Sequence, residues 1–346
     1  MSHKSTLLIN AYCSQHQVSA PEFATQTHAW RDHSDSNLAQ HLQGFISYVM
    51  SRGEEGMSYA KYHIYRHLQK TRQHLSFSIE PDDMASLGAW ASDANALLFL
   101  ADGHVRDPHG LILLSADEGA SERGAQVPYP ASAWQRKQRN DALLNQMQIR
   151  VATHQPPVVA ESEVVMRSPY QVAERALALF LVALKAEALC SGNADMAGQI
   201  KPQFPLSQEF FSDAELAYFN QAQPDDHTNV QFCWRYESLA VLLWAIGRLP
   251  ELPAPTQICD VTQIAQVMLA QPELELLQNV SLRPDAEILD ALDLHFRLHW
   301  AVRQARQDQQ MHLGEIQSGV VYERHYALNW LTCFEEADWD QVDTPT

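Results

Sequence analysis

The sequence lacks the long hydrophobic runs of a membrane protein. Its longest apolar run, Ala176 to Leu184, ends at Lys185, well short of the roughly 20 residues that cross a bilayer as a helix. Near the N-terminus, Leu7-Leu8-Ile9 is too short to be a signal-peptide core. The five cysteines are odd in number and form no C-x-x-C pair, which argues against a disulfide framework and a zinc knuckle. We therefore expect a soluble cytoplasmic protein that has no membrane partner.

Basic residues are scarce in the C-terminal part of the chain. The whole sequence has a net charge of -18 at neutral pH. Residues 1–150 hold 13 Lys and Arg against 15 Asp and Glu, whereas residues 151–346 hold 11 against 27. Binding to a phosphate backbone needs clustered positive charge, so this distribution argues against a nucleic-acid partner. It is compatible with a basic protein partner.

Catalytic and cofactor-binding motifs are missing as well. The sequence has neither a glycine-rich phosphate loop nor a G-x-S-x-G elbow, so we assign no catalytic residue and no cofactor. His63 and His67 have the spacing of a two-histidine metal site, and so do His295 and His299. Neither pair has the adjacent glutamate of the zincin motif, and Arg297 lies inside the second pair. We therefore expect no metal and interpret these histidines as residues of helix–helix contacts.

The residues that are present suffice for folded cores. Hydrophobic residues make up 46% of the chain, and eight are tryptophan. In residues 1–130, segments with the alternation of strands are interleaved with segments of helical periodicity, which predicts an α+β domain. The predicted strands are residues 6–13, 74–80, 96–100 and 111–114, the predicted helices are 37–50 and 58–70, and residues 24–36 are predicted to form a loop.

The character of the chain changes after residue 130. Residues 131–160 read as a connecting helix and a linker that contains Pro156-Pro157. Helical periodicity then dominates, so residues 161–346 are predicted to form an all-α domain. Ser168 and Ser212 each open a capping box, and one unbroken helix is predicted from about residue 226 to residue 245. The predicted fold is an α+β N-terminal domain followed by an all-α C-terminal helical domain.

Several helices of the predicted all-α domain carry ionisable residues among apolar ones. An unpaired buried charge costs several kcal/mol, so such residues need partners within the fold. Asp293 and Arg297 form an i, i+4 pair in the favourable order. The candidate polar cluster consists of Arg235, Glu237, Asp293, Arg297, His299, Glu323, Arg324 and His325.

This candidate polar cluster has two interpretations. It is either a buried ion-pair network that holds helices in register, or a pocket with a carboxylate and a histidine for acid–base catalysis. Because no nucleophile or cofactor motif accompanies it, the structural interpretation is preferred.

Spaced motifs in residues 130–346 resemble a known protein family, "domain of unknown function 4272", which is found in many bacteria. Residues 44–114 also look like the longer, two-part members. The resemblance implies an intracellular protein and no assigned activity. The motifs are Trp234-Arg-Tyr-Glu-Ser with Leu242-Leu-Trp-Ala-Ile-Gly247, Cys259-Asp-Val261, Glu287-Ile-Leu-Asp-Ala291, Asp293 to Ala301, Glu323-Arg-His-Tyr-Ala-Leu-Asn-Trp-Leu331 and Trp339-Asp with Val342.

Two functions from different classes are compatible with these features. The first is a non-enzymatic protein-binding module with an acidic surface, such as an immunity-type protein that neutralises a basic toxin or another basic partner. The second is a hydrolase-type enzyme that uses the candidate polar cluster as its pocket. The acidic C-terminal half and the missing catalytic motifs favour the first.

Overall fold

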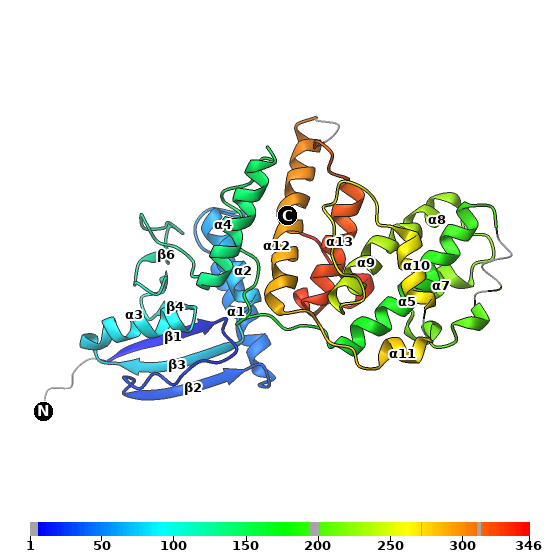
Figure 1. Cartoon of the computed structure of the whole chain (residues 1–346). Coiled ribbons are helices and arrows are strands. Elements are labelled where there is room, and N and C mark those ends of the chain that lie inside the picture. The colour runs from blue at the N-terminus through cyan, green and yellow to red at the C-terminus, as the bar shows by residue number, and fades with distance from the viewer. Residues whose placement is uncertain (1–5, 194–198, 200, 271, 310–312) are drawn as a thin grey trace, which may run out of the picture. The chain divides into compact units, whose positions relative to one another are not determined.

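The computed structural model describes residues 6–193, 199, 201–270, 272–309 and 313–346. The chain divides into two compact units (Figure 1). Unit 1 comprises Met1–Gln135 and Val159–Glu163, and unit 2 comprises Arg136–Val158 and Val164–Thr346. Unit 1 is built on an antiparallel sheet with helices, and unit 2 is mostly helical. The predicted fold class, α+β followed by all-α, is thus confirmed.

Unit 1 contains a six-stranded sheet with the order β2-β3-β1-β4-β5-β6, in which neighbouring strands pair antiparallel. The long strands β1 and β3 pair residue by residue from Leu7↔Ile79 to Cys13↔Gln73. The strands are β1 (Leu7–Cys13), β2 (Gln26–Asp32), β3 (Gln73–Ile79), β4 (Ala96–Leu100), β5 (Val105–Arg106) and β6 (Ile112–Leu114). The helices that begin in this unit are α1 (Asn37–Met50), α2 (Tyr59–Gln69), α3 (Met84–Asp93) and α4 (Ala131–Gln146), of which α4 continues into unit 2.

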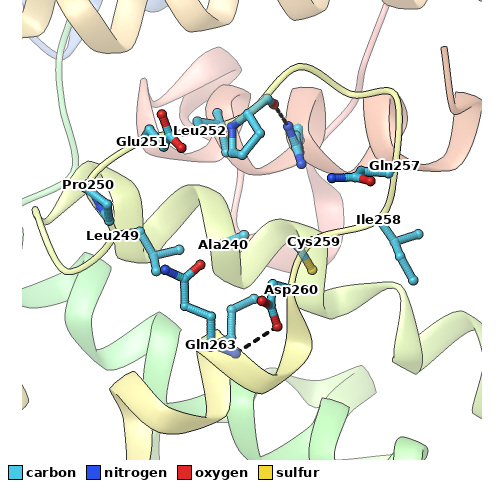
Figure 2. Close-up of a pocket in the computed structure, with 13 residues that line it drawn as sticks. Ala240, Leu249, Pro250, Glu251, Leu252, Gln257, Ile258, Cys259, Asp260 and Gln263 are labelled. Carbon is cyan, nitrogen blue, oxygen red and sulfur yellow. Dashed lines mark hydrogen bonds between the residues drawn. The ribbon is translucent and has the colours of Figure 1, made fainter. Parts of the chain in front are cut away.

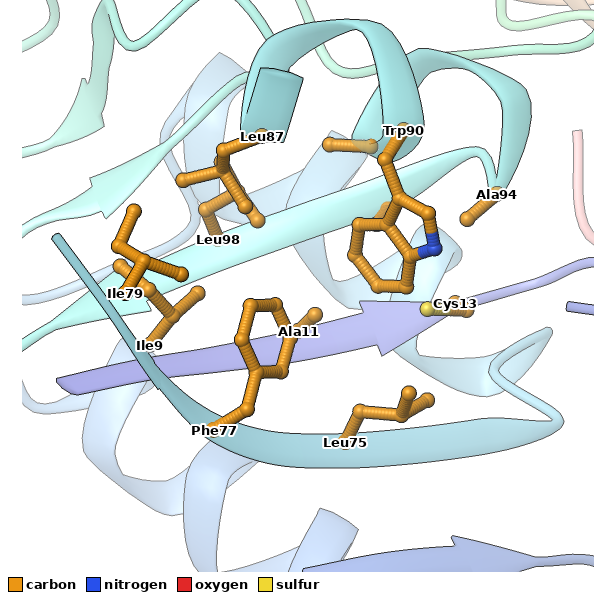
Figure 3. Packing of buried hydrophobic residues seen from close by; sticks show 12 residues of the cluster. Ile9, Ala11, Cys13, Leu75, Phe77, Ile79, Leu87, Trp90, Ala94 and Leu98 are labelled. Carbon is orange, nitrogen blue, oxygen red and sulfur yellow. The ribbon is translucent and has the colours of Figure 1, made fainter. Parts of the chain in front are cut away.

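The central strands of this sheet are buried on both faces, and successive side chains of a strand point to opposite sides. Ala11 of β1 packs in the cluster under α3, whereas its neighbour Tyr12 packs in the cluster under α1 and α2. Figure 3 shows Trp90 of α3 reaching toward the strand face that carries Phe77, whose ring centroid lies 5.4 Å from that of Trp90. The unit is therefore a sheet with helices on both sides.

One strand contradicts the sequence prediction. Residues 24–36 were expected to be a loop, but β2 pairs with β3 along the edge of the sheet, with a register shift between Thr27 and Ala29. All of its residues are exposed or only half-buried. Its sequence is polar and does not alternate, because an edge strand with solvent on its faces has little hydrophobic side to display.

Unit 2 is organised around α5, an Ala- and Leu-rich helix that is buried along most of its length. Helix α5 contacts α8 and α9, and α13 contacts α9 and α12. The predicted capping boxes at Ser168 and Ser212 are both formed, with the Ser168 hydroxyl accepting from the backbone N–H of Gln171. The helices are α5 (Pro169–Cys190), α7 (Asp213–Asn220), α8 (Asp226–Cys233), α9 (Arg235–Ala245), α10 (Val261–Leu269), α11 (Glu273–Leu277), α12 (Asp285–Gln307) and α13 (Ser318–Leu331).

The helix predicted to run unbroken from residue 226 to residue 245 is divided at Trp234 into α8 and α9. The indole of Trp234 lies against Gly319 of α13, and a Cβ atom at Gly319 would come within 2.7 Å of this ring. The division therefore coincides with a packing contact that no local sequence signal announces. None of the helices in the described residues combines the length and apolar character needed to cross a membrane.

Candidate functional site

Two ion pairs connect α9 and α13 in a reciprocal manner. Arg235 of α9 donates from Nη1 to Oε2 of Glu323 at 3.0 Å, and Arg324 of α13 donates from Nε to Oε2 of Glu237 at 3.0 Å. Each helix thus gives one arginine and one glutamate. The Ser238 hydroxyl also donates to the Glu323 carboxylate at 2.9 Å. The four charged residues therefore form two ion pairs between α9 and α13, which fix the register of the two helices.

The pair of Glu237 and Arg324 is almost completely buried, with side-chain exposures of 2% and 1%. Glu237 also accepts from the backbone N–H of Cys259, and Arg324 donates from Nη1 to the carbonyl of Pro253. These bonds satisfy both charges with protein groups, which a buried pair requires to offset its desolvation. They also attach the loop that follows α9 to the helices.

Asp293 and Arg297 form a separate pair on α12. Arg297 donates from Nε and Nη2 to the two carboxylate oxygens of Asp293 at 2.8 and 2.7 Å, and both side chains are fully buried. Asp293 also accepts from Asn140 of α4 at 2.9 Å, and Arg297 lies 3.4 Å from the carboxylate of Asp141. This pair joins α12 to α4, so the structure does not bring all the predicted residues into one site.

His299 and His325 are the remaining members of the candidate polar cluster. Their Nδ1 atoms lie 3.0 Å apart across α12 and α13. Burial, followed by the nearby charges of Arg303 and Arg306, lowers the pKa of His299 to about 4. His299 is therefore neutral at pH 7 and retains little basicity for removing a proton.

The other histidines that were considered as metal ligands also have protein partners. His63 Nδ1 lies 2.9 Å from the Tyr129 hydroxyl, and His67 Nε2 lies 2.9 Å from the Tyr12 carbonyl. His295 Nδ1 lies 2.8 Å from the carbonyl of Ala291. Metal ligation would have to replace these bonds at one nitrogen or use the other nitrogen of each ring.

A small cavity of about 120 Å³ lies beside the pair of Glu237 and Arg324. Figure 2 shows the segment from Leu249 to Asp260 passing over α9, with Ala240 of α9 and Gln263 of α10 also lining the space. The thiol of Cys259 lines this cavity, but burial and the charge of Glu237 raise its pKa. A protonated thiol is a poor nucleophile, so Cys259 is not activated for covalent catalysis.

A fourth buried pair was missed by the sequence analysis. Arg175 of α5 donates from Nη2 to the carboxylate of Glu215 on α7, and both side chains are at least nine-tenths buried. Burial raises the pKa of Glu215 and lowers that of Arg175, each against the effect of its partner. Glu215 was noticed only as part of the capping box at Ser212. The available signal was a single arginine that directly precedes the longest apolar run.

An open groove of about 440 Å³, which was not predicted from the sequence, lies next to this pair. We call it the acidic groove. Its carboxylates come from Glu174, Asp213, Asp338 and Asp340, and its aromatic side chains from Phe210, Phe211, Trp330 and Trp339. These residues belong to segments that are far apart in the chain, so local motifs could not have grouped them.

Carboxylates outnumber available positive charges in the acidic groove. Of its two arginines, Arg175 is paired with Glu215, and Arg167 donates to the carbonyls of Trp330 and Ala337. Among the described residues, no ion pair involves the groove's carboxylates within 4 Å. Partial burial raises the pKa of Glu174, which indicates a carboxylate without a compensating cation.

No curated protein and no solved structure matches the chain. The model of the family described as "Domain of unknown function (DUF4272)" matches residues 136–342, which is more than half of the chain. The matched range contains the ion pairs of α9, α12 and α13 and the acidic groove. The chain therefore belongs to the family of the domain of unknown function DUF4272.

Proposed function

We propose that unit 2 is a protein-binding module that receives a basic segment of a partner protein in the acidic groove. The observation that carries this proposal is a groove whose carboxylates form no ion pair among the described residues and whose lining includes the half-buried rings of Phe210 and Phe211. Lys and Arg side chains bind to carboxylates and also stack on aromatic rings. A bound cation would offset the partial desolvation of Glu174, whose pKa is raised in the free protein. Neutralisation of a basic toxin is one form that such binding would take.

The candidate polar cluster supports this function more than it supports a hydrolase. Both glutamates of the cluster, Glu237 and Glu323, are bound to arginines. The low pKa of His299 and the raised pKa of Cys259 give neither side chain the reactivity of a base or nucleophile at neutral pH. The ion pairs of the cluster are therefore proposed to hold α9 and α13 in place.

The proposal is tested with an arginine-containing peptide as the probe, by titration calorimetry at low and at moderate salt. Glu174→Gln combined with Asp338→Asn should weaken binding by about tenfold or more, because two carboxylates of the acidic groove lose their charge. Neither side chain makes a hydrogen bond or ion pair among the described residues, so the variant should keep its melting temperature.

The matched control is Glu275→Gln combined with Asp226→Asn, which removes two exposed charges outside the acidic groove. This control should bind the peptide nearly as well as the unaltered protein. Equal weakening by both double variants would show that the peptide responds only to net charge, and would contradict a specific groove. Absence of peptide binding at low salt would also contradict it.

A further inference from the structure

A second open pocket of unit 2, of about 300 Å³, includes Glu323 of the α9–α13 ion pairs in its lining and is rich in arginine, in contrast to the acidic groove. We call it the arginine pocket. It lies where α12 ends and α13 begins, and its lining includes Trp234, His299, Arg303, Arg306, Gly319 and Tyr322. It shares no residue with the acidic groove.

The positive charge of the arginine pocket is not neutralised within the described residues. Arg303 donates to the hydroxyl of Thr346 at 3.1 Å, and Arg306 donates to the hydroxyl of Ser318 at 2.9 Å. Both acceptors are hydroxyl groups, in contrast to the carboxylates bound by the buried arginines of this unit. The one carboxylate in the lining, Glu323, is occupied by Arg235. Two exposed guanidinium groups therefore remain available to an anion.

The first turn of α13 adds backbone donors to the same pocket. Its N-cap residue, Gln317, gives no side-chain hydrogen bond to the helix. The backbone N–H groups of Ser318 and Gly319 at the helix start thus lack a side-chain cap, and both residues line the pocket. Uncapped N–H groups and the helix dipole favour negative charge at this position. Gly319 also allows the indole of Trp234 to lie directly on this turn.

His299 contributes a buried polar group at the pocket wall. His299 is 7% exposed, and its Nδ1 lies 3.0 Å from Nδ1 of His325. That contact uses Nδ1. The second ring nitrogen, Nε2, has no hydrogen-bond partner among the described residues. When His325 donates to His299 Nδ1, the His299 ring carries its proton on Nε2. In that arrangement His299 becomes a neutral hydrogen-bond donor to a ligand.

We propose that the arginine pocket binds the phosphoryl group of a small molecule that also carries a planar ring. Two guanidinium groups and a helix N-terminus suit a dianion better than a singly charged carboxylate. Trp234 and the half-exposed Tyr322 provide flat surfaces for the ring. This ligand is chemically unrelated to the basic peptide of the acidic groove, so the two proposals stand or fall separately.

The test is titration calorimetry with phenyl phosphate, inorganic phosphate and benzoate as probes. Phenyl phosphate should bind most tightly, because it alone has both the dianion and the ring. Arg303→Gln combined with Arg306→Gln should weaken its binding by about tenfold or more. Both side chains are exposed, and an unchanged melting temperature will verify that the variant is folded. Tyr322→Ala should weaken phenyl phosphate but leave inorganic phosphate unaffected.

The charge-matched control is Arg123→Gln combined with Arg139→Gln, two exposed arginines that do not line the arginine pocket. It should bind phenyl phosphate like the unaltered protein. The proposal is overturned if phenyl phosphate does not bind, if benzoate binds equally well, or if the Arg303 and Arg306 variant matches the Arg123 and Arg139 control. An equal loss of both phosphate probes in Tyr322→Ala would overturn the assignment of the ring to the aromatic wall.

Discussion

Unit 1 and unit 2 treat their buried polar residues differently. Both units bury histidines that are kept neutral, since the pKa of His67 in unit 1 and that of His295 in unit 2 are each lowered to about 4. Unit 2 in addition buries arginines opposite carboxylates, as in Arg324 with Glu237. No arginine is buried among the described residues of unit 1, where the buried Glu163 pairs with the partly exposed Lys70.

The difference follows from how neighbouring strands and neighbouring helices are held in register. Strands are joined by backbone hydrogen bonds, so the pairing of β1 with β3 already fixes their register. A helix satisfies its own backbone, and only side chains determine how it sits against its neighbours. We infer that the ion pairs of unit 2 supply the specificity that the sheet of unit 1 obtains from its backbone.

The strongest way to break this comparison is to remove Arg297. Arg297→Ala should leave the carboxylate of Asp293 buried without its cation, and we expect a loss of about 3–5 kcal/mol in the free energy of unfolding. The measurement is urea denaturation of the single variant and of Arg297→Leu combined with Asp293→Leu. The double variant should recover much of the loss, because no buried charge remains. Wild-type stability of Arg297→Ala would mean that the pair does not stabilise the fold.

The sequence predicted the larger features of the fold well, and the reasons are local. The strand at residues 74–80 alternates cleanly, and the serines at 168 and 212 carry complete capping boxes. Strand β2 could not be predicted, because its pairing with β3 is set by the rest of the sheet. The division at Trp234 likewise coincides with a contact to Gly319, which is far away in the chain.

For the candidate polar cluster, the sequence predicted which residues need partners but could not assign most of them. An ionisable residue among the apolar residues of a helix is expected to have a partner of opposite charge. Only the i, i+4 pair of Asp293 and Arg297 could be assigned from spacing. The crossed pairing of Arg235 with Glu323 depends on how α9 and α13 are packed. The acidic groove could not be predicted at all, because segments from α5 to the C-terminal residues meet only in the folded unit.

A smaller effect is expected from acid. Burial is the main cause of the lowered pKa of His67, from 6.5 to about 4. The folded state therefore favours the neutral ring, and the resulting stability is fully present above pH 6.5 and is lost as the pH falls from 6.5 toward 4. We expect the part of this loss that falls between pH 7 and pH 5 to be on the order of 2 kcal/mol. His67→Gln, whose amide takes no proton, should reduce the loss in urea denaturation measured at pH 7 and pH 5.

The companion variant in unit 2 is His295→Gln. His295 is fully buried as well, and burial followed by the charge of Arg324 lowers its pKa to about 4. Its replacement should also flatten the dependence of stability on pH between 6.5 and 4. If neither variant changed that dependence, neutral buried histidines would not explain acid sensitivity in either unit.

The smallest effect is expected from ion pairs at the surface, and it shows whether burial or mere pairing underlies the comparison. Glu287 pairs with Arg283 at 3.1 Å but its side chain is 49% exposed, and Asp102 of unit 1 pairs with Arg106 at 2.6 Å and is 43% exposed. Water screens both pairs, so Glu287→Gln and Asp102→Asn should each cost less than about 1 kcal/mol in urea denaturation. Added salt should reduce even that difference, because screening weakens exposed pairs more than buried ones. If Glu287→Gln were as damaging as Arg297→Ala, the number of ion pairs rather than their burial would determine the stability of unit 2.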